Sequence, residues 1–517
     1  MKKLAFLMLF ASSSVAAQTW SDNTASIVYN KCATCHHPGG IAPFSLMSYA
    51  EVSPMATAIH DAISMNEMPP WPPDENYQQY SHSRALSAAD KTTMLDWIAN
   101  GAPEGNPANA PAPPVFNSGS ILGNGDLTLQ IPLYQSKANG QDDYVCFSLP
   151  TGLTQNRYVR AMEIVPGNRE IVHHALIYID PTGSYQGDTI GGNCGGPPQS
   201  STMIGGYTPG ASPLIFPSAT GFKLGMSIPA NSNIVFAMHY PDGSFGQYDS
   251  TKVILHFYPP GETGIREVYA APVLQNWSLS IPPNQVTSFT AQYPNSGGVP
   301  INYSVLSVFP HMHLLGNNIR AYAVTPANDT VKFADIPHWD FHWQDFYFFK
   351  YLQKVPVGSV MKGEATYDNT VNNMHNPNNP PVWVFAGEST TDEMFLVYFH
   401  FLQYQQGDEL IDLESLISLG MQELTSDDDW KIHPVPFSES VSIKPADLKA
   451  GDVVSLAIYD YQGRLVRTLC SKQTIQSVFS GFEWDGLSDT GSEVKAGTYF
   501  ISMNCNGSLS SHPVLKR

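Results

Sequence analysis

Charged residues are scarce in this sequence, and basic residues are the scarcer kind. Lys and Arg total 26 against 45 Asp and Glu, only 14% of the 517 residues are charged, and the formal net charge is −19. Because a nucleic-acid-binding surface needs a basic footprint, this balance argues against a nucleic-acid partner. Apolar runs are short as well, and none is long enough to span a bilayer, so we expect no transmembrane anchor.

Glycine, proline and aromatic residues are abundant. The chain has 40 Gly, 41 Pro, 25 Tyr and 25 Phe. This composition favours many short strands joined by turns over long helices. At about 100–200 residues per domain, the length predicts roughly three to five domains. We therefore expect a mainly β protein.

The first 17 residues read as a signal peptide. Lys2 and Lys3 form the positive start, Leu4 to Phe10 are apolar, and Val15-Ala16-Ala17 offers small residues for cleavage before Gln18. A buried N-terminal helix is the alternative. We expect an exported protein at the cell surface or outside the cell, where disulfides persist.

Six cysteines are present, and two of them belong to a motif described below. The other four form a pair in the middle of the chain and a pair near its end. We predict the disulfides Cys146–Cys194 and Cys470–Cys505, because extracellular β modules often carry one such crosslink each. Free buried thiols are the alternative.

The pattern of residues changes along the chain. Helix-like segments at Ser48–Ile63 and at Ser87–Asn100, the second capped by Ser87, precede a Pro/Ala/Asn-rich linker. Short alternating runs follow, as in antiparallel β-sandwiches. The region that contains them is too long for one sandwich. The predicted domains are a signal peptide (1–17), a helical domain (18–105), a linker (106–114), two β-sandwiches (115–282 and 283–433) and a C-terminal Ig-like β-sandwich (434–517).

A C-x-x-C-H motif lies in the helical domain, at Cys32, Cys35 and His36. In an exported chain this spacing predicts a covalently bound haem c, with both thiols attached to the haem and the His as axial ligand. A redox dithiol or half of a zinc site is the alternative. Met68, followed by prolines on a rigid loop, is the expected second ligand, and Met65 is the runner-up. A packing role in the core for either Met is the alternative. The segment resembles a small bacterial class of cytochrome c domain in which the Met before Pro-Pro-Trp is the axial ligand.

Histidines gather in three places within the β region. His173 and His174 are adjacent, His239 follows in another strand, and His311 and His313 are two residues apart. Side chains two apart on a strand share a face, so His311 and His313 can bind one metal. Adjacent histidines can share a metal only at a bulge, a strong twist or a strand end. Neutral imidazoles fit copper or zinc, and an added thioether would favour Cu(I).

In combination, the motifs HHALIY, MHY, HMHLLG and TTDEM resemble the copper type II ascorbate-dependent monooxygenases, the family of peptidylglycine α-hydroxylating and dopamine β-monooxygenases. The resemblance covers about residues 115–433 and implies two jelly-roll-like sandwiches facing across a cleft. It implies an electron-transfer copper at His173, His174 and His239, and a dioxygen-binding, hydroxylating copper at His311, His313 and Met394. Cys146 and Cys194 resemble one of the family disulfides.

Departures from the family pattern concern the substrate. Where peptide-hydroxylating members have an Arg for the substrate carboxylate, this chain has Phe309, and Leu396 and Ala237 replace an Asn and a Gln. Tyr398 is retained, as a substrate hydrogen-bonding residue or as a core Tyr. We therefore expect an apolar substrate and not a peptide ending in glycine. We treat four further β-region histidines as structural residues or as supports of the ligands: His338, His342, His375 and His400. Contact of one of them with substrate or with copper is the alternative.

The C-terminal stretch resembles the sorting domains of proteins exported by the type IX secretion system, through motifs such as Trp484-Asp485-Gly486 and Gly497-Thr498-Tyr499. This implies secretion machinery as a partner, and a plain Ig-like spacer is the alternative.

We interpret the chain as an exported copper monooxygenase that hydroxylates a C–H bond of a small molecule, with two copper ions and one haem c. Its electrons would come from ascorbate or another donor, relayed through the fused haem. A non-enzymatic copper-binding or electron-transfer protein is the first alternative, and an adhesin with incidental histidines is the second.

Overall fold

The computed structural model describes residues 18–516, except 39, 41, 82, 115, 117–119, 190–193, 195–199, 210, 220, 418–429, 436, 446–447, 461–463, 477–480, 496 and 506–507. The predicted signal peptide, residues 1–17, lies outside the described residues. The chain divides into a unit formed by Met1–Pro70 and Arg84–Phe116 and a unit formed by Trp71–Ser83 and Asn117–Arg517.

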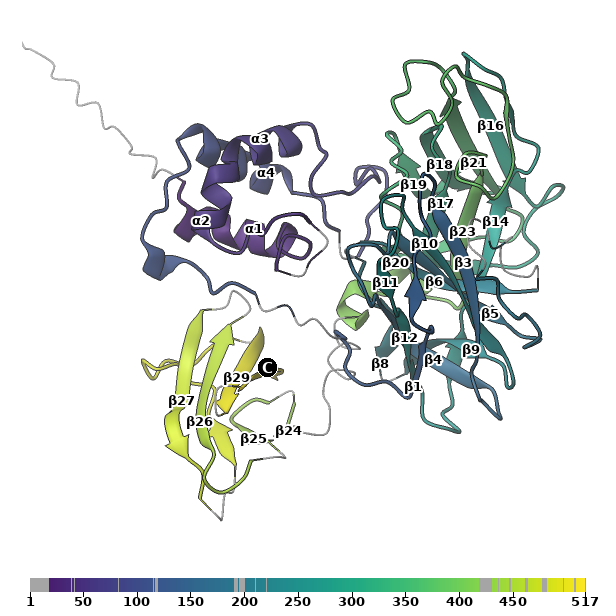
Figure 1. Cartoon of the computed structure of the whole chain (residues 1–517). Helices are drawn as coiled ribbons and strands as arrows, with labels where there is room; N and C mark the ends of the chain where they lie inside the picture. Colours follow the sequence, from purple (N-terminus) through teal and green to yellow (C-terminus); the bar gives the residue numbers. More distant parts are fainter. Residues whose placement is uncertain are drawn as a thin grey trace, which may run out of the picture. The chain divides into compact units, whose positions relative to one another are not determined.

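The first unit is helical (Figure 1). Its helices are η1 (Trp20–Thr24), α1 (Ala25–Lys31), α2 (Tyr49–Val52), η2 (Ser53–Met55), α3 (Ala56–Ser64), α4 (Ala88–Ala99) and η3 (Pro107–Asn109). The Oγ of Ser87 accepts a hydrogen bond from the backbone N–H of Asp90 at 3.0 Å, which confirms the predicted cap of α4. Trp20 and Trp97 are buried in the core between these helices.

The second unit begins with a pair of sheets. One has the order β1-β12-β4-β9-β13, with β7 beside β4 and β8 beside β9, and the other has the order β3-β10-β5-β6. Their strands, with the small ribbon β2/β11, are β1 (Leu127–Gln130), β2 (Tyr134–Gln135), β3 (Asp143–Pro150), β4 (Arg157–Val165), β5 (His174–Asp180), β6 (Thr202–Tyr207), β7 (Leu214–Ile215), β8 (Ser218–Ala219), β9 (Phe222–Ile228), β10 (Asn233–Tyr240), β11 (Tyr248–Asp249), β12 (Lys252–Phe257) and β13 (Ile265–Glu267). Alternate residues such as Val145, Phe147 and Ile177 form a core shared by both sheets.

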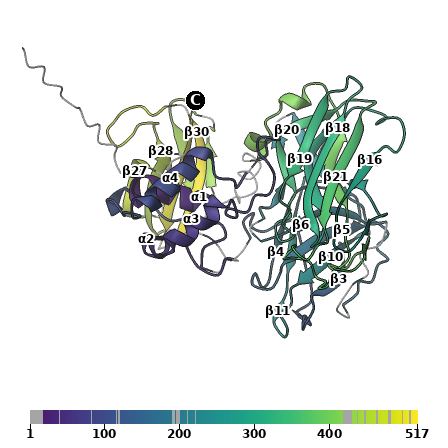
Figure 2. The ribbon, with the colours of Figure 1, turned by 90° about the horizontal axis from the view of Figure 1, so that it is seen from above.

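A second pair of sheets follows, with the orders β14-β23-β17-β20 and β16-β21-β18-β19. The strands of the second of these sheets lie side by side in Figures 1 and 2. Its strands, with the ribbon β15/β22, are β14 (Tyr269–Gln275), β15 (Ser280–Ile281), β16 (Val286–Tyr293), β17 (Tyr303–His311), β18 (Gly316–Val324), β19 (Thr330–Ile336), β20 (Tyr347–Val355), β21 (Val360–Asp368), β22 (Val384–Phe385) and β23 (Leu396–Gln403). The turn η4 (Asp408–Leu410) follows β23. Because β14 pairs with β23, this sheet pair begins before the division that we placed at residue 282.

Residues 71–83 pack on this second sheet pair, although the sequence placed them in the helical domain. The hydroxyl of Tyr80 donates a hydrogen bond to the backbone carbonyl of Phe333 at 2.9 Å. The Trp71 ring meets the Tyr347 ring edge-on at 5.3 Å. The segment that follows Met68-Pro69-Pro70 is therefore anchored among buried aromatic side chains.

The C-terminal region has sheets ordered β24-β25-β28 and β27-β26-β29-β30. Their strands are β24 (Trp430–His433), β25 (Val441–Pro445), β26 (Val453–Asp460), β27 (Leu465–Thr474), β28 (Phe482–Trp484), β29 (Gly497–Cys505) and β30 (Ser508–Lys516). These strands surround their own core, which is centred on Trp484.

The predicted disulfide Cys146–Cys194 is present, but Cys470–Cys505 was wrong, because both of these cysteines are free. Cys470 lies on β27 and Cys505 on β29, and β26 runs between these strands. Strands two positions apart are separated by roughly 9–10 Å. A disulfide joins Cα atoms that are at most about 7 Å apart.

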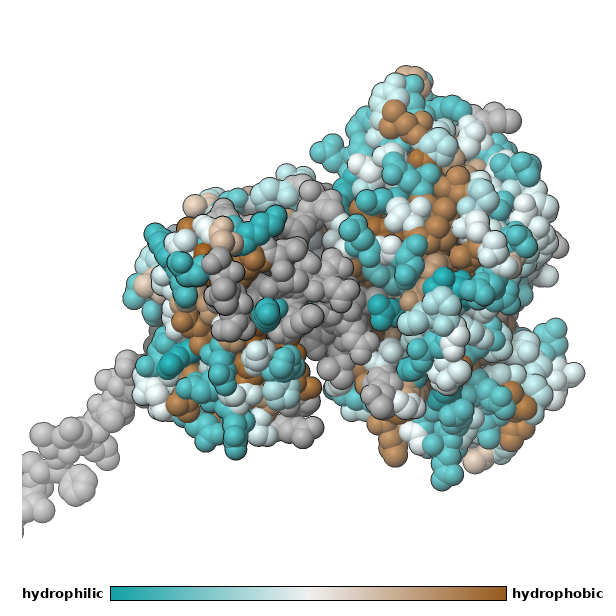
Figure 3. Space-filling model, turned by 90° about the horizontal axis from the view of Figure 1, so that it is seen from below, coloured by the Kyte–Doolittle hydropathy of each residue, from teal (hydrophilic) through white to brown (hydrophobic). Residues whose placement is uncertain are grey.

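The prediction of a mainly β protein with β-sandwiches is confirmed. Within the described part of the chain, we find no helix that has both the length and the apolar character needed to cross a membrane. Figure 3 shows hydrophobic residues in patches among the hydrophilic residues on the face in view. Across the described residues, the exposed hydrophobic side chains of residues 269–403 include Trp277, Trp383 and Phe385.

Candidate functional site

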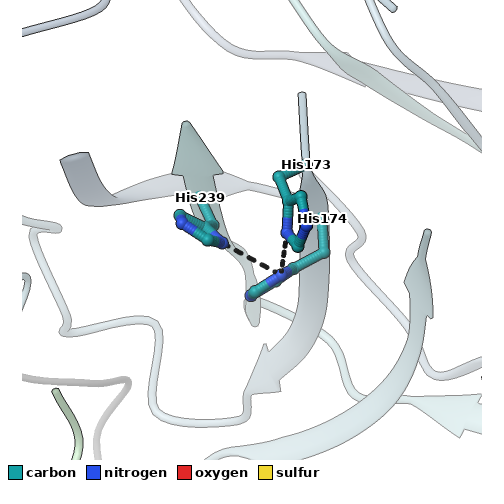
Figure 4. A group of neighbouring side chains, drawn as sticks. All are labelled: His173, His174 and His239. Atoms are coloured by element: carbon teal, nitrogen blue, oxygen red, sulfur yellow. Dashed lines mark hydrogen bonds between the residues drawn. The ribbon is translucent and has the colours of Figure 1, made fainter. Parts of the chain in front are cut away.

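Three histidines meet where β5 and β10 lie side by side. His174 opens β5 and is directly opposite His239 on β10, while the backbone N–H of His173 donates to the carbonyl of His239 at 3.1 Å. The double His therefore lies at a strand end, one of the arrangements that allow adjacent side chains to converge. The Nδ1 atom of His174 is 3.2 Å from Nδ1 of His173 and 3.2 Å from Nδ1 of His239 (Figure 4). One ring nitrogen from each residue fits within a mutual distance of 4.8 Å, as a shared metal requires.

Two side chains outside the cluster, Asp142 and Tyr144, hold the ring of His239 in place. Its Nε2 is 2.9 Å from a carboxylate oxygen of Asp142, and Tyr144 stacks on its ring at 4.3 Å. Because a carboxylate only accepts, Nε2 carries the proton and Nδ1 presents its lone pair to the cluster. Burial alone would raise the pKa of Asp142, but the hydrogen bond and charge of His239 hold it below its usual value.

Burial keeps the rings of His173 and His174 neutral. It lowers the pKa of His173 to about 3 and that of His174 well below its usual value, with a further contribution from His239 in each case. A neutral imidazole is the form that coordinates a metal, so this cluster suits a cation that takes nitrogen ligands.

A second cluster lies where β17 meets β23. His311 ends β17 opposite Leu396, and Met394 precedes Leu396 by two residues. The rings of His311 and His313 are 5.1 Å apart, and both line the same cavity as the largely buried Met394. Two imidazoles and a thioether are therefore gathered around one space, and this donor set suits copper in its reduced state.

Both rings of this cluster are held through Nδ1. His311 Nδ1 donates to Oε1 of Gln344 at 2.6 Å, and His313 Nδ1 donates to the carbonyl of Asp392 at 3.1 Å. Each bond fixes the tautomer and leaves the lone pair on Nε2. Burial lowers the pKa of His311 to about 4 and that of His313 to about 3, so both are neutral at physiological pH.

Glu393 links the backbone segments that carry His313 and Met394. Sequence reasoning did not identify this residue. Its carboxylate is fully buried and accepts hydrogen bonds from the backbone N–H groups of His313, Leu315 and Met394 at 2.9, 2.6 and 3.2 Å. Burial raises the pKa of Glu393 to about 8. A Glu beside a ligand Met at the edge of an apolar strand was the signal that could have revealed it.

Both clusters border one cavity of about 850 Å³. His174 lines it with His311, His313 and Met394, and its walls include the predicted substrate-side residues Phe309, Leu396 and Tyr398. Phe309 stacks on Phe346 at 4.7 Å. Among the described residues that form the wall there is one carboxylate, Glu388, and no Lys or Arg. The cavity therefore offers no cationic partner for a carboxylate and much apolar surface.

The loop between β19 and β20 reaches both clusters. The Phe341 ring lies 6.1 Å from the His173 ring and 5.9 Å from the His313 ring. Gln344 from the same loop holds His311, and the Trp339 ring N–H donates to the carbonyl of His313 at 3.1 Å. Sequence reasoning named His338 and His342 on this loop as structural residues or supports of the ligands, but it did not identify Trp339, Phe341 or Gln344.

The histidines that we treated as structural residues or supports divide into buried and exposed ones. His400 is fully buried, with Nδ1 2.8 Å from Oγ of Ser307. His338 and His375 are exposed, while the half-exposed His342 has its ring 5.4 Å from that of His173.

In the helical unit, Cys32 and Cys35 are free thiols just after α1. His36 Nδ1 donates to the carbonyl of Phe44 at 3.1 Å, which leaves the lone pair on Nε2. Met68 is 37% exposed and Met65 is 61% exposed, so Met68 is the more enclosed of the two predicted ligands. Two thiols for covalent attachment and an oriented imidazole for the iron are the groups that the C-x-x-C-H motif offers to a c-type haem.

Comparison with known proteins gives one family. A search of curated proteins found no match. Solved structures with some similarity include PorZ of Porphyromonas gingivalis (18% identical, 24% of this chain and 15% of that chain, TM-score 0.14) and the β-glucuronidase of Parabacteroides merdae (10%, 50% and 33%, TM-score 0.12). The VP2 subviral particle of infectious bursal disease virus is 9% identical (58% and 76%, TM-score 0.16). This chain thus spans a third or less of the first two proteins. TM-scores this low do not indicate a shared fold.

Residues 268–421 match the family described as "Copper type II ascorbate-dependent monooxygenase, C-terminal domain". The matched segment contains His311, His313 and Met394. Residues 268–421 are therefore similar to the C-terminal domain of the copper type II ascorbate-dependent monooxygenases.

Proposed function

We propose that this protein is an exported copper-dependent monooxygenase that hydroxylates a C–H bond of a small, largely apolar molecule. The observation that carries the proposal is the second cluster, in which His311, His313 and Met394 line the cavity that His174 of the first cluster also borders. The family match over residues 268–421 supports copper-dependent hydroxylation, and we infer that residues 115–282 supply the other half of the enzyme. We infer that the sheet pairs are jelly-roll-like.

The two clusters fit two copper ions. His173, His174 and His239 would hold an electron-transfer copper through nitrogen, and His311, His313 and Met394 would hold the other through two nitrogens and one sulfur. Copper at the second site would supply the binding and reductive activation of dioxygen. The overall reaction consumes substrate, dioxygen, two electrons and two protons and gives an alcohol and water.

The protein's own residues would bind the substrate and keep water out. Phe309 and Leu396 give apolar walls, so they favour an uncharged substrate surface beside the thioether of Met394. Tyr398 lines the same cavity, and burial raises its pKa to about 12, so its hydroxyl remains a hydrogen-bond donor to substrate. The bonds from Gln344 and from the Asp392 carbonyl would hold the ligand rings still during turnover.

We further propose that Cys32, Cys35, His36 and Met68 bind a haem c that passes electrons toward the copper sites, with ascorbate or another reductant as the source. The reduced thiols and the orientation of His36 support this. Residues 1–17 would direct export, and residues 434–517 would act as a sorting domain for secretion machinery. We propose the domain boundaries predicted from the sequence, except that β14 belongs with the second sandwich and residues 71–83 pack on that sandwich.

Metal analysis and oxygen uptake test the proposal on the full chain. We expect about two coppers and one haem per chain, and oxygen consumption that depends on an apolar substrate and a reductant. His311→Ala should abolish uptake and leave the haem content and the fold intact.

Two results would contradict the proposal. Two bound coppers with no substrate-dependent uptake would favour a copper-binding electron carrier, and the absence of stoichiometric copper would favour an adhesin. The haem relay fails separately if reduced haem is reoxidised no faster when copper, dioxygen and substrate are all present.

A further inference from the structure

The first cluster supplies three imidazoles from one sheet pair, but an additional ring approaches it from the other. Residues 337–346 connect β19 to β20, and this loop carries His342 to the side of His173. The two rings meet edge-on with their centres 5.4 Å apart. Phe341 stacks on the same His173 ring at 6.1 Å, so the loop contacts the cluster through two consecutive side chains.

His342 is oriented in the same way as the cluster member His239. One carboxylate oxygen of Asp340 accepts from both the backbone N–H and Nδ1 of His342, at 2.9 and 3.0 Å. Since the carboxylate only accepts, Nδ1 carries the proton and Nε2 carries the lone pair. His239 shows the mirror arrangement, with Asp142 on Nε2 and the lone pair on Nδ1. A carboxylate behind the ring is the usual support of a metal-binding imidazole.

The coordination preference of copper gives this ring a role. Cu(II) favours tetragonal surroundings with four nitrogen or oxygen donors, and the cluster of mutually close atoms contains three. Resting on the function proposed above, we propose that His342 is a fourth nitrogen donor of the first copper site and that it binds the oxidised ion. The side chain of His342 is 53% exposed, so its ring can turn toward the cluster without leaving a packed core.

This assignment gives the loop a structural consequence. The three cluster histidines belong to the first sheet pair and His342 to the second, so Cu(II) at this site would crosslink the two pairs. Asp142 and Asp340, each bonded to one ligand ring, would offset the charge of the ion.

Copper titration of the full chain tests this, in a His313→Ala background so that the first site is observed alone. We expect His342→Ala to lower the Cu(II) affinity of that site by about tenfold or more, in line with losses seen at ligand-supporting positions. Its Cu(II) electron paramagnetic resonance spectrum should show altered nitrogen coupling, while Cu(I) affinity stays within about twofold. His342→Gln removes the imidazole but keeps a side-chain amide that can donate to Asp340. It should lose Cu(II) affinity as His342→Ala does, and this result would show that the loss does not come from a folding defect.

The matched control is His338→Ala, an exposed His on the same loop, which should leave both affinities and the spectrum unchanged. An unchanged Cu(II) affinity and spectrum in both His342 variants would overturn this proposal alone. If adding His173→Ala to the His313→Ala background removes no copper, the first site does not hold copper. The proposed function then fails at that site, and this proposal fails with it.

Discussion

The carboxylate of Glu393 accepts a hydrogen bond from the backbone N–H of His313 at 2.9 Å. The same carboxylate accepts from the N–H of Met394, and its remaining oxygen accepts from Leu315. One buried side chain thus holds the end of β17 against the segment that carries the thioether. The proposed copper site depends on this link, because His313 and Met394 are 81 residues apart in the sequence (394 − 313).

Glu393→Gln should weaken the second cluster without removing a ligand. An amide has one accepting oxygen in place of two, and its NH₂ group would face a backbone donor. Above the pKa of about 8, where Glu393 is ionised and both of its oxygens accept, we expect a loss of about 1–3 kcal/mol in the free energy of unfolding and the loss of copper from one of the two sites. Chemical unfolding and metal analysis measure these effects. Glu364→Gln, on an exposed position of β21, is the control and should change neither.

The ion pair between Arg266 and Asp408 should make stability depend on pH. Both carboxylate oxygens of Asp408 accept from Arg266 at 2.7 Å, and Ser304 adds a third bond at 2.6 Å. Although burial raises the pKa of Asp408, these bonds hold it below its usual value. A carboxyl with a lowered folded-state pKa stabilises fully above its unfolded value, near 3.9, and loses this contribution as pH falls through the folded value.

Asp408→Asn should therefore destabilise the β unit by about 3–5 kcal/mol at neutral pH, because it leaves a largely buried Arg266 without its partner. The deficit should shrink as the pH is lowered toward 3, which urea unfolding of both proteins across this range would reveal. Asp335→Asn, which breaks a more exposed pair with Arg320, should cost less than about 1 kcal/mol. A constant deficit at every pH would contradict the assignment.

Met68→Ala should lower the reduction potential of the haem, because a Met/His pair raises it. Potentiometric titration of the full chain measures the shift. Met65→Ala, three residues earlier and more exposed, should leave the potential unchanged. The reverse result would make Met65 the ligand, and no change in either variant would exclude both.

Local patterns predicted what short-range physics determines. The Ser87 cap follows from residues close in sequence, and the strand end at which the double His lies was one of three arrangements that the sequence left open. The packing of residues 71–83 could not be predicted, since it depends on buried partners such as Phe333 that lie some 250 residues away. The error over Cys470 and Cys505 has the same origin, because only the strand order places β26 between them.

The donor sets show the same limit. Imidazoles and a thioether are recognisable by type, so the sequence could name them, but the groups that orient them are common residues. Gln344, Asp142 and Glu393 acquire their roles only through contacts made after folding.

X-ray absorption of the Cu(I)-loaded full chain tests the central claim most directly, because sulfur and nitrogen neighbours of copper are distinguishable. We expect one sulfur neighbour for every two coppers, and its complete loss in Met394→Leu. Met312→Leu, at the fully buried core position between the two ligand histidines, should keep it. If the sulfur signal is absent from the unaltered protein, or survives in Met394→Leu, then His311, His313 and Met394 do not share a copper and the hydroxylase assignment is wrong.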